Sequence, residues 1–166
     1  MPGRAQHSVF AYGSNLHLQD LASWMVIRGL GEPGISGVAV AELPAHRLAW
    51  NHRSAARGAG AANVEPEPGS SVWGALLEVD ARTLAAIDLK EGHPHRYNRG
   101  DRPSAVLTAA GAALAWVYRV TPAYRRPGPV PPTAEYLSIV LDGARQLGLP
   151  DAWLDHLSWV QTLDSC

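Results

Sequence analysis

The chain has 166 residues, of which 46% are hydrophobic and 17% are charged, a balance that favours one folded domain, residues 1–166, over disorder. With 14 basic and 15 acidic residues the net charge is −1, so we expect neither nucleic acid nor an anionic membrane as a partner. The one cysteine, Cys166, excludes an internal disulfide, and no apolar run is long enough to span a bilayer. We therefore expect a reduced, cytoplasmic protein, and we attribute the presence of a single lysine, Lys90, to compositional bias.

The first half of the chain predicts a strand, a helix and further strands. In order, these are a strand at 9–12, a helix at 18–26, and strands at 38–43, 47–51 and 71–79. Residues 54–69 are rich in Gly, Ala, Pro and Glu, which predicts a long ordered loop or flap whose only strand-like piece is 61–64. The strand at 71–79 is apolar on both faces, so we expect both faces to be covered, as in a closed barrel with outer helices.

The second half predicts helices at both ends of a strand pair. Asp80 is a candidate N-cap for a helix that ends at Lys90-Glu91-Gly92, and Thr133 is a candidate N-cap for a second helix. The remaining predicted elements are strands at 104–108 and 113–120, a stiff proline-rich connection at 122–132, and helices at 134–146 and 151–163.

The junction after the first strand is the first candidate site. Gly13 can take a positive φ, and the side chains of Ser14 and Asn15 can bend or cap the chain. Several backbone N–H groups would then point in one direction and could bind a carboxylate or an oxyanion. Small residues at such a turn are common in α/β proteins, so an ordinary structural turn is an equally good interpretation of this stretch alone.

Glu91 is the second candidate. It stands at the end of a predicted helix, where the helix dipole disfavours an ionised carboxylate, and burial would raise its pKa further. A carboxylate in that position is a candidate general base and acid near neutral pH. On this argument alone, a solvated helix terminus is the better interpretation of Glu91.

These two segments together resemble the gamma-glutamylcyclotransferases. The run Phe10-Ala11-Tyr12-Gly13-Ser14-Asn15-Leu16 is similar to their Tyr-Gly-Ser-Asn loop, and Leu89-Lys90-Glu91-Gly92 with Tyr97 resembles their catalytic Glu-Gly segment. Three further stretches follow in the family's order, at 61–64, 72–74 and 132–150. Thr133 stands where the family pattern leads us to expect serine, and 54–60 matches no part of that pattern.

The resemblance implies an α+β fold, a small mixed β-barrel with flanking helices, and a reaction at one mouth of that barrel. The free α-amine of a γ-glutamyl group attacks its own γ-carbonyl, which releases 5-oxoproline and an amine or amino acid. The resemblance assigns Glu91 as the catalytic residue and implies no metal, nucleotide or other cofactor. It assigns substrate binding to the loop and to three tyrosines: Tyr12, Gly13, Ser14, Asn15, Leu16, Tyr97, Tyr118 and Tyr136.

Several alternatives stay open on the sequence. The scaffold could serve a γ-glutamyl hydrolase or amidase that releases glutamate, or a relative that binds γ-glutamyl ligands without catalysis. His93 and His95 could begin a metal site, and Ser14 with His17 could form a nucleophile pair, although no Gly-x-Ser-x-Gly elbow is present. The group beyond the γ-glutamyl unit is undetermined, whether an amino acid, a dipeptide such as that of glutathione, or an amine, and the assembly could be a monomer or a homodimer.

Overall fold

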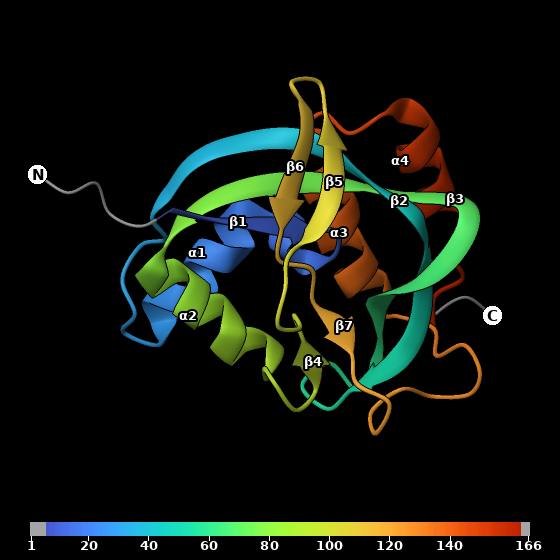
Figure 1. The fold of residues 1–166 in the computed structure, drawn as a ribbon. Coiled ribbons are helices and arrows are strands. Elements are labelled where there is room, and N and C mark those ends of the chain that lie inside the picture. The colour runs from blue at the N-terminus through green and yellow to red at the C-terminus, as the bar shows by residue number, and fades with distance from the viewer. Residues whose placement is uncertain (1–5, 164–166) are drawn as a thin grey trace, which may run out of the picture.

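The computed structural model describes residues 6–163, so Cys166 lies outside the described range. The helices are α1 (Leu18–Ile27), α2 (Ala81–Glu91), α3 (Ala134–Gln146) and α4 (Asp151–Ser158), with a short 3₁₀ turn, η1 (Ser14–Leu16). The strands are β1 (Gln6–Ala11), β2 (Ile35–Ser54), β3 (Ala59–Asp80), β4 (Tyr97–Asn98), β5 (Ser104–Thr108), β6 (Gly111–Ala115) and β7 (Arg119–Val120). This arrangement confirms the α+β class (Figure 1).

Two long strands, β2 and β3, form the frame of the molecule and curve together across it (Figure 1). They belong to an antiparallel five-stranded sheet in the order β1-β3-β2-β5-β6, while β4 and β7 pair separately. The strands predicted at 38–43 and 47–51 are one strand with an irregular register between Pro44 and His46. Ala45 adopts a φ of 58° there, so a local kink replaces the break that Pro44 suggested.

The expected barrel is not closed. One edge strand, β1, approaches the end of β6 at a single parallel bridge between Val9 and Trp116, where the Phe10 N–H donates to the Trp116 carbonyl over 2.9 Å. The chain then leaves the sheet, and β7 pairs with β4 instead of continuing β6. The strand predicted at 113–120 is therefore two strands in two sheets, and the β1 edge is joined at one point rather than along a ladder.

The expected flap at 54–69 is wrong, because most of this segment is the first half of β3. Residues 55–58 form the turn of the β2–β3 hairpin, and Leu48 pairs with Val64 in register. Gly60 serves close packing rather than flexibility, because a β-carbon there would collide with the Val130 carbonyl. Its N–H also donates to Pro131, which ties the proline-rich segment to the strand.

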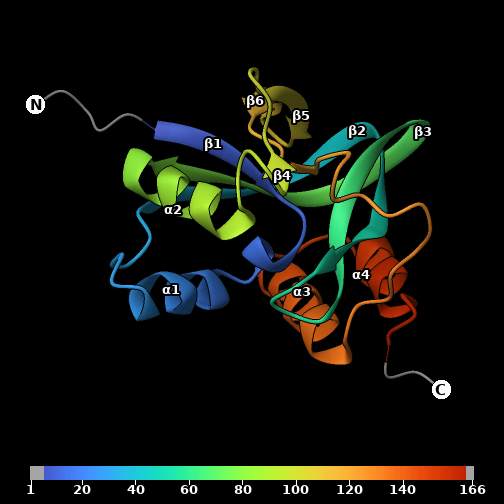
Figure 2. The ribbon, with the colours of Figure 1, turned by 90° about the horizontal axis from the view of Figure 1, so that it is seen from below.

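Helices α1, α3 and α4 lie on one side of the sheet, while α2 runs beside β1 (Figure 2). The predicted caps are confirmed: Asp80 accepts from the Thr83 N–H over 2.8 Å and Thr133 accepts from the Tyr136 N–H over 3.1 Å. Helix α4 ends at Ser158, earlier than the predicted 163. Within residues 6–163 no helix is both long and apolar enough to cross a membrane.

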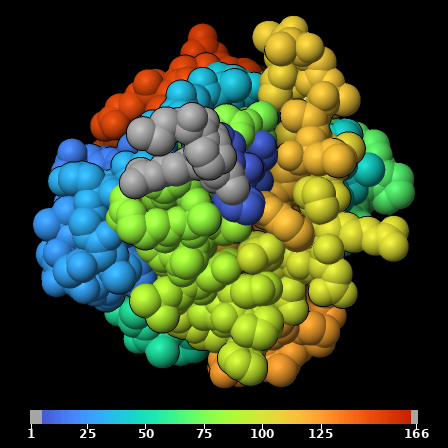
Figure 3. All heavy atoms as spheres, turned by 60° about the vertical axis from the view of Figure 1, so that its left-hand side comes forward, coloured from blue at the N-terminus to red at the C-terminus, as the bar shows by residue number. Residues whose placement is uncertain are grey.

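The β5–β6 hairpin stands out from the body of the molecule (Figures 1 and 3). The apolar core instead gathers β1, the two end portions of β3 and the inner faces of α1, α2 and α3, with Phe10, Leu16, Leu77 and Ile87 almost fully buried. The end of β1 and the end of α2 are therefore both anchored in one core, which fixes the relative position of the two candidate segments.

Candidate active site

The loop after β1 presents three backbone donors. The Leu16 N–H donates to the Gly13 carbonyl over 3.1 Å and the His17 N–H to the Ser14 carbonyl over 3.0 Å, which closes η1. In the described part of the chain, the N–H groups of Gly13, Ser14 and Asn15 have no backbone acceptor, and that of Ser14 faces the Tyr136 phenol. Three successive N–H groups therefore lie outside the backbone ladders of the fold, which is what an anion-binding loop requires.

The predicted reason for glycine at position 13 is wrong. Gly13 has a φ of −117°, which L-residues adopt, so no positive φ is required. A β-carbon there would instead lie 3.3 Å from Tyr136 Oη and 3.7 Å from Ala62 Cβ. Glycine leaves room for the Tyr136 phenol of α3, which approaches the loop more closely than a β-carbon usually allows.

Glu91 is the last residue of α2, and Gly92, with a φ of 69°, ends the helix. The Asn15 side-chain amide donates to Glu91 Oε1 over 2.9 Å. Lys90 Nζ donates to Asn15 Oδ1 over 2.7 Å and to Ser14 Oγ over 3.1 Å. Because the lysine holds the amide oxygen, the amide nitrogen must face the Glu91 carboxylate.

Lys90 is thus a site residue that the sequence reasoning missed. Burial lowers its pKa, although the Glu91 and Asp20 carboxylates act in the opposite direction. The overlooked signal was that the chain's single lysine stands directly before the candidate catalytic residue.

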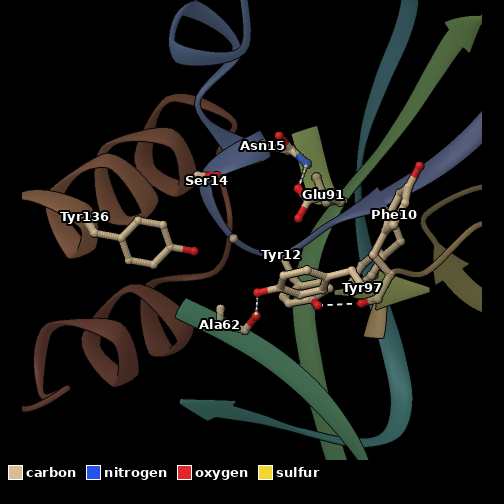
Figure 4. A pocket seen from close by; sticks show the side chains of 11 residues that line it. Phe10, Tyr12, Ser14, Asn15, Ala62, Glu91, Tyr97 and Tyr136 are labelled. Carbon is tan, nitrogen blue, oxygen red and sulfur yellow. Dashed lines mark hydrogen bonds between the residues drawn. The ribbon is translucent and has the colours of Figure 1, made fainter. Parts of the chain in front are cut away.

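Four tyrosines surround the loop and the carboxylate. Tyr12 donates to the Tyr118 carbonyl over 2.5 Å, and Tyr97 donates to the Ala62 carbonyl over 2.7 Å (Figure 4). Burial raises the pKa of Tyr12, Tyr97 and Tyr118, and it raises the pKa of Tyr136 to about 12. All four phenols are therefore neutral near pH 7 and act as donors or acceptors, not as bases.

Tyr118 is held by a charged pair that the sequence reasoning also missed. Its hydroxyl donates to Asp88 Oδ1 over 2.5 Å, and Arg99 Nε donates to the same oxygen over 2.9 Å. Burial alone would raise the pKa of Asp88, but the hydrogen bonds from Arg99 and Tyr118 lower it overall. The network fixes the Tyr118 ring at the site while leaving Asp88 ionised.

The structure brings nearly all of the predicted residues around one inner cavity of about 40 Å³ (Figure 4). Leu16 is the exception, because its side chain is buried in the core and its N–H is used within η1. The inner cavity is lined by Phe10, Ala11, Tyr12, Gly13, Ser14, Asn15, Ala62, Glu91, Tyr97, Tyr118 and Tyr136.

Comparison with known proteins also indicates the gamma-glutamylcyclotransferases that the motifs resemble. Residues 9–138 match the family model described as gamma-glutamyl cyclotransferase, AIG2-like. The chain belongs to this family. The match includes both the Tyr12–Asn15 loop and Glu91.

One similar protein agrees in part of its sequence, and two solved structures agree in their fold. A Methanocaldococcus jannaschii protein named "Putative gamma-glutamylcyclotransferase MJ1514" is 42% identical over 55 residues, which is 33% of this chain and 45% of that protein. A solved structure described as gamma-glutamyl cyclotransferase has a TM-score of 0.81 at 23% identity, covering 96% of this chain and 90% of the other. The Homo sapiens protein described as uncharacterized protein loc79017 has a TM-score of 0.77 at 24% identity, covering 97% and 91%.

A second, outer cavity of about 260 Å³ adjoins the inner one in this cyclotransferase-family chain. The two share Ser14, Glu91, Tyr97 and Tyr136 in their linings. His52 also lines the outer cavity, with its ring 5.3 Å from that of Tyr97, and burial lowers its pKa. Glu91 therefore stands at the junction between a small polar cavity and a larger open one.

The two histidine alternatives gain no geometric support. Among residues 6–163 no group of three or more His, Cys, Asp or Glu side chains is placed to hold a metal ion, and His93 instead packs edge-on against Tyr118. His17 Nδ1 accepts from the Asp20 N–H at the start of α1. In the described residues no hydrogen bond joins Ser14 Oγ to His17; Ser14 Oγ accepts from Lys90 instead, so the Ser14–His17 pair is not formed.

Proposed function

We propose that this protein is a gamma-glutamylcyclotransferase that converts a γ-glutamyl compound into 5-oxoproline and a free amine or amino acid. The observation that carries the proposal is the placement of the Glu91 carboxylate and the N–H groups of the Gly13–Asn15 loop around one cavity. A base and a set of anion-binding donors are the two parts that this cyclisation needs. Membership of the cyclotransferase family supports the same conclusion.

The proposed reaction forms one carbon–nitrogen bond and breaks another. The α-ammonium of the γ-glutamyl group gives a proton to Glu91, and the neutral amine then attacks the γ-carbonyl. As the tetrahedral intermediate collapses, protonated Glu91 gives its proton to the leaving nitrogen, and the regenerated carboxylate takes the second proton from the ring nitrogen, which becomes the lactam N–H. The leaving group departs as an amine and takes up that second proton, so Glu91 returns to its starting state. The nucleophile is tethered to its target, so proximity comes largely from the substrate.

The loop and the tyrosines position the substrate in this proposal. The N–H groups of Gly13, Ser14 and Asn15 bind the α-carboxylate or the developing oxyanion. Such hydrogen bonds are strongest where water is excluded. Lys90 and Asn15 hold Glu91 in place from the other side. Both proton transfers pass through Glu91, so the mechanism uses no metal, nucleotide or other cofactor.

A screen of γ-glutamyl compounds for 5-oxoproline release tests the proposal. γ-Glutamyl amino acids, γ-glutamyl amines and glutathione are incubated with the protein, and 5-oxoproline and glutamate are quantified separately. We expect 5-oxoproline in a one-to-one ratio with the released amine. Release of glutamate instead would favour the γ-glutamyl hydrolase or amidase, and binding without any product would favour the non-catalytic relative.

A further inference from the structure

The outer cavity carries a marked excess of positive charge. Arg28, Arg57 and Arg96 line it together with Lys90, whereas Glu91 is the one carboxylate among its lining residues. The three arginines come from distant parts of the chain: the end of α1, the β2–β3 turn and the segment after α2. The fold therefore collects three guanidinium groups at the mouth of the site.

These guanidinium groups are not neutralised by the protein. In the part of the chain that the structure describes, none of the three forms an ion pair, although Arg47, Arg82, Arg99 and Arg145 all do. Lys90 differs, because its ammonium already donates to Ser14 and Asn15. Among the described residues, the positive charge of the cavity that forms no ion pair or hydrogen bond of this kind is thus that of the three arginines.

Two of the three arginines are held in place beside the catalytic centre. The Arg57 guanidinium lies 4.5 Å from the centre of the Tyr136 ring, the phenol that also faces Gly13. The Arg96 guanidinium packs over Gly92, so closely that a β-carbon there would collide with it. Gly92 directly follows Glu91, so the Arg96 guanidinium packs against the residue next to the proposed base.

Arg28 is anchored on helix α1 instead. Its guanidinium stacks on the Trp24 ring at 4.1 Å and donates to the Trp24 carbonyl over 3.2 Å. Of the three guanidinium groups, only those of Arg57 and Arg96 therefore pack against parts of the catalytic centre, the Tyr136 ring and Gly92.

We infer that the outer cavity selects substrates whose leaving amine carries a carboxylate, and that Arg57 and Arg96 are the residues that recognise it. The inference rests on the proposed function, which places the γ-glutamyl unit in the inner cavity and directs the leaving nitrogen past Glu91 into the outer one. Guanidinium groups bind carboxylates through paired charged hydrogen bonds, which suits them to this role. The substrate class is then γ-glutamyl amino acids or peptides rather than γ-glutamyl amines.

A matched pair of substrates tests this selection. γ-Glutamyl-alanine and γ-glutamyl-alaninamide have leaving groups of nearly equal size, but only the first carries a negative charge. We expect kcat/KM for the first to be higher by about tenfold or more, the usual effect of hydrogen bonds to a charged group. The selectivity ratio, which is kcat/KM for γ-glutamyl-alanine divided by kcat/KM for γ-glutamyl-alaninamide, should fall severalfold in Arg57→Gln and in Arg96→Gln. Arg53→Gln, which removes an exposed arginine of β2 outside the cavity, should keep the ratio of the wild type.

A second readout needs no variant. Added salt screens exposed charges, so raising the ionic strength should lower the selectivity ratio of the wild-type protein. A ratio near one in the wild type, or a ratio that neither arginine variant changes, would overturn the inference. In both cases 5-oxoproline would still form, so the proposed function would stand. Absence of 5-oxoproline from every γ-glutamyl compound would instead overturn the proposed function, and the inference with it.

Discussion

Asn15 and Glu91 are 76 residues apart in the chain, yet the Asn15 amide donates a hydrogen bond of 2.9 Å to the Glu91 carboxylate. One residue comes from the turn after β1 and the other from the last position of α2. Lys90 fixes the direction of this contact, since its ammonium binds the amide oxygen. The donor loop and the proposed base are thus one hydrogen-bonded unit, and disturbing either residue should disturb both.

Replacing Glu91 by Gln keeps the size of the side chain and removes the proton acceptor. We expect kcat to fall by about 10²–10⁴, the range for loss of a general acid and base, with the near-UV circular dichroism unchanged. Glu32→Gln, an exposed carboxylate in the loop before β2, is the matched control and should retain full activity. Near-normal kcat in the Glu91 variant would remove Glu91 from the mechanism.

Gly13→Ala should reduce kcat/KM more than Ser14→Ala. The methyl group added by Gly13→Ala would lie 3.3 Å from Tyr136 Oη and would narrow the inner cavity. Ser14→Ala removes a hydroxyl but keeps the backbone N–H at position 14. Each tenfold loss corresponds to about 1.4 kcal/mol of transition-state stabilisation. An inactive Ser14→Ala beside a nearly normal Gly13→Ala would restore the serine-nucleophile interpretation.

A double variant tests whether Gly13 acts through Tyr136. Tyr136→Phe removes the oxygen that the methyl added at position 13 would approach, so Gly13→Ala should cost less kcat/KM in the Tyr136→Phe background than in the wild type. Equal losses in the two backgrounds would mean that the methyl acts on another neighbour, such as Ala62.

The free energy of unfolding should depend on Tyr136 at high pH. Burial raises the pKa of its phenol to about 12, against about 10 in an unfolded chain, so the folded state holds the proton more tightly. This stabilisation is fully present below pH 10 and is lost as the pH rises towards 12, by up to about 3 kcal/mol. Urea denaturation of the wild type and of Tyr136→Phe at pH 9 to 11 should therefore give a shallower decline for the variant. The lowered pKa of Lys90 has the opposite pH dependence, but it is common to both proteins and cancels in the comparison.

Chelators should leave the activity unchanged, because the proposed mechanism moves both protons through Glu91. The measurement is 5-oxoproline release before and after dialysis against EDTA, with Zn²⁺ then added back. Loss of activity with EDTA and its recovery with zinc would restore His93 and His95 as candidate metal ligands.

The sequence predicted the elements that local signals specify. The caps Asp80 and Thr133 and the helix end at Gly92 were predicted because side chains and glycine act within a few residues. The segment after Ser54 was misjudged, since Gly and Ala there look like loop composition. Gly60 is in fact needed where β3 packs against the Val130 and Pro131 backbone, a contact that only the tertiary fold creates.

The same limit applies to the site. The loop and Glu91 could be predicted from motifs, but the reason for Gly13 could not, because Tyr136 approaches it from α3. Lys90 stands within the Glu-Gly segment, but its role, like the Asp88–Arg99 pair, emerged only through contacts made across the fold. The barrel is not closed because β6 ends at Ala115 and the chain beyond it meets β1 at a single bridge, a pairing of distant segments that strand propensity does not specify.

The most direct test of intramolecular cyclisation is to block the nucleophile. A γ-glutamyl substrate and its Nα-acetyl derivative are compared for release of the leaving amine, with the unmodified compound as the positive control. If the tethered α-amine attacks the γ-carbonyl, acetylation removes the nucleophile and release of the amine should stop. Continued release of the amine from the acetylated compound, accompanied by N-acetylglutamate, would contradict cyclisation and identify the protein as a hydrolase.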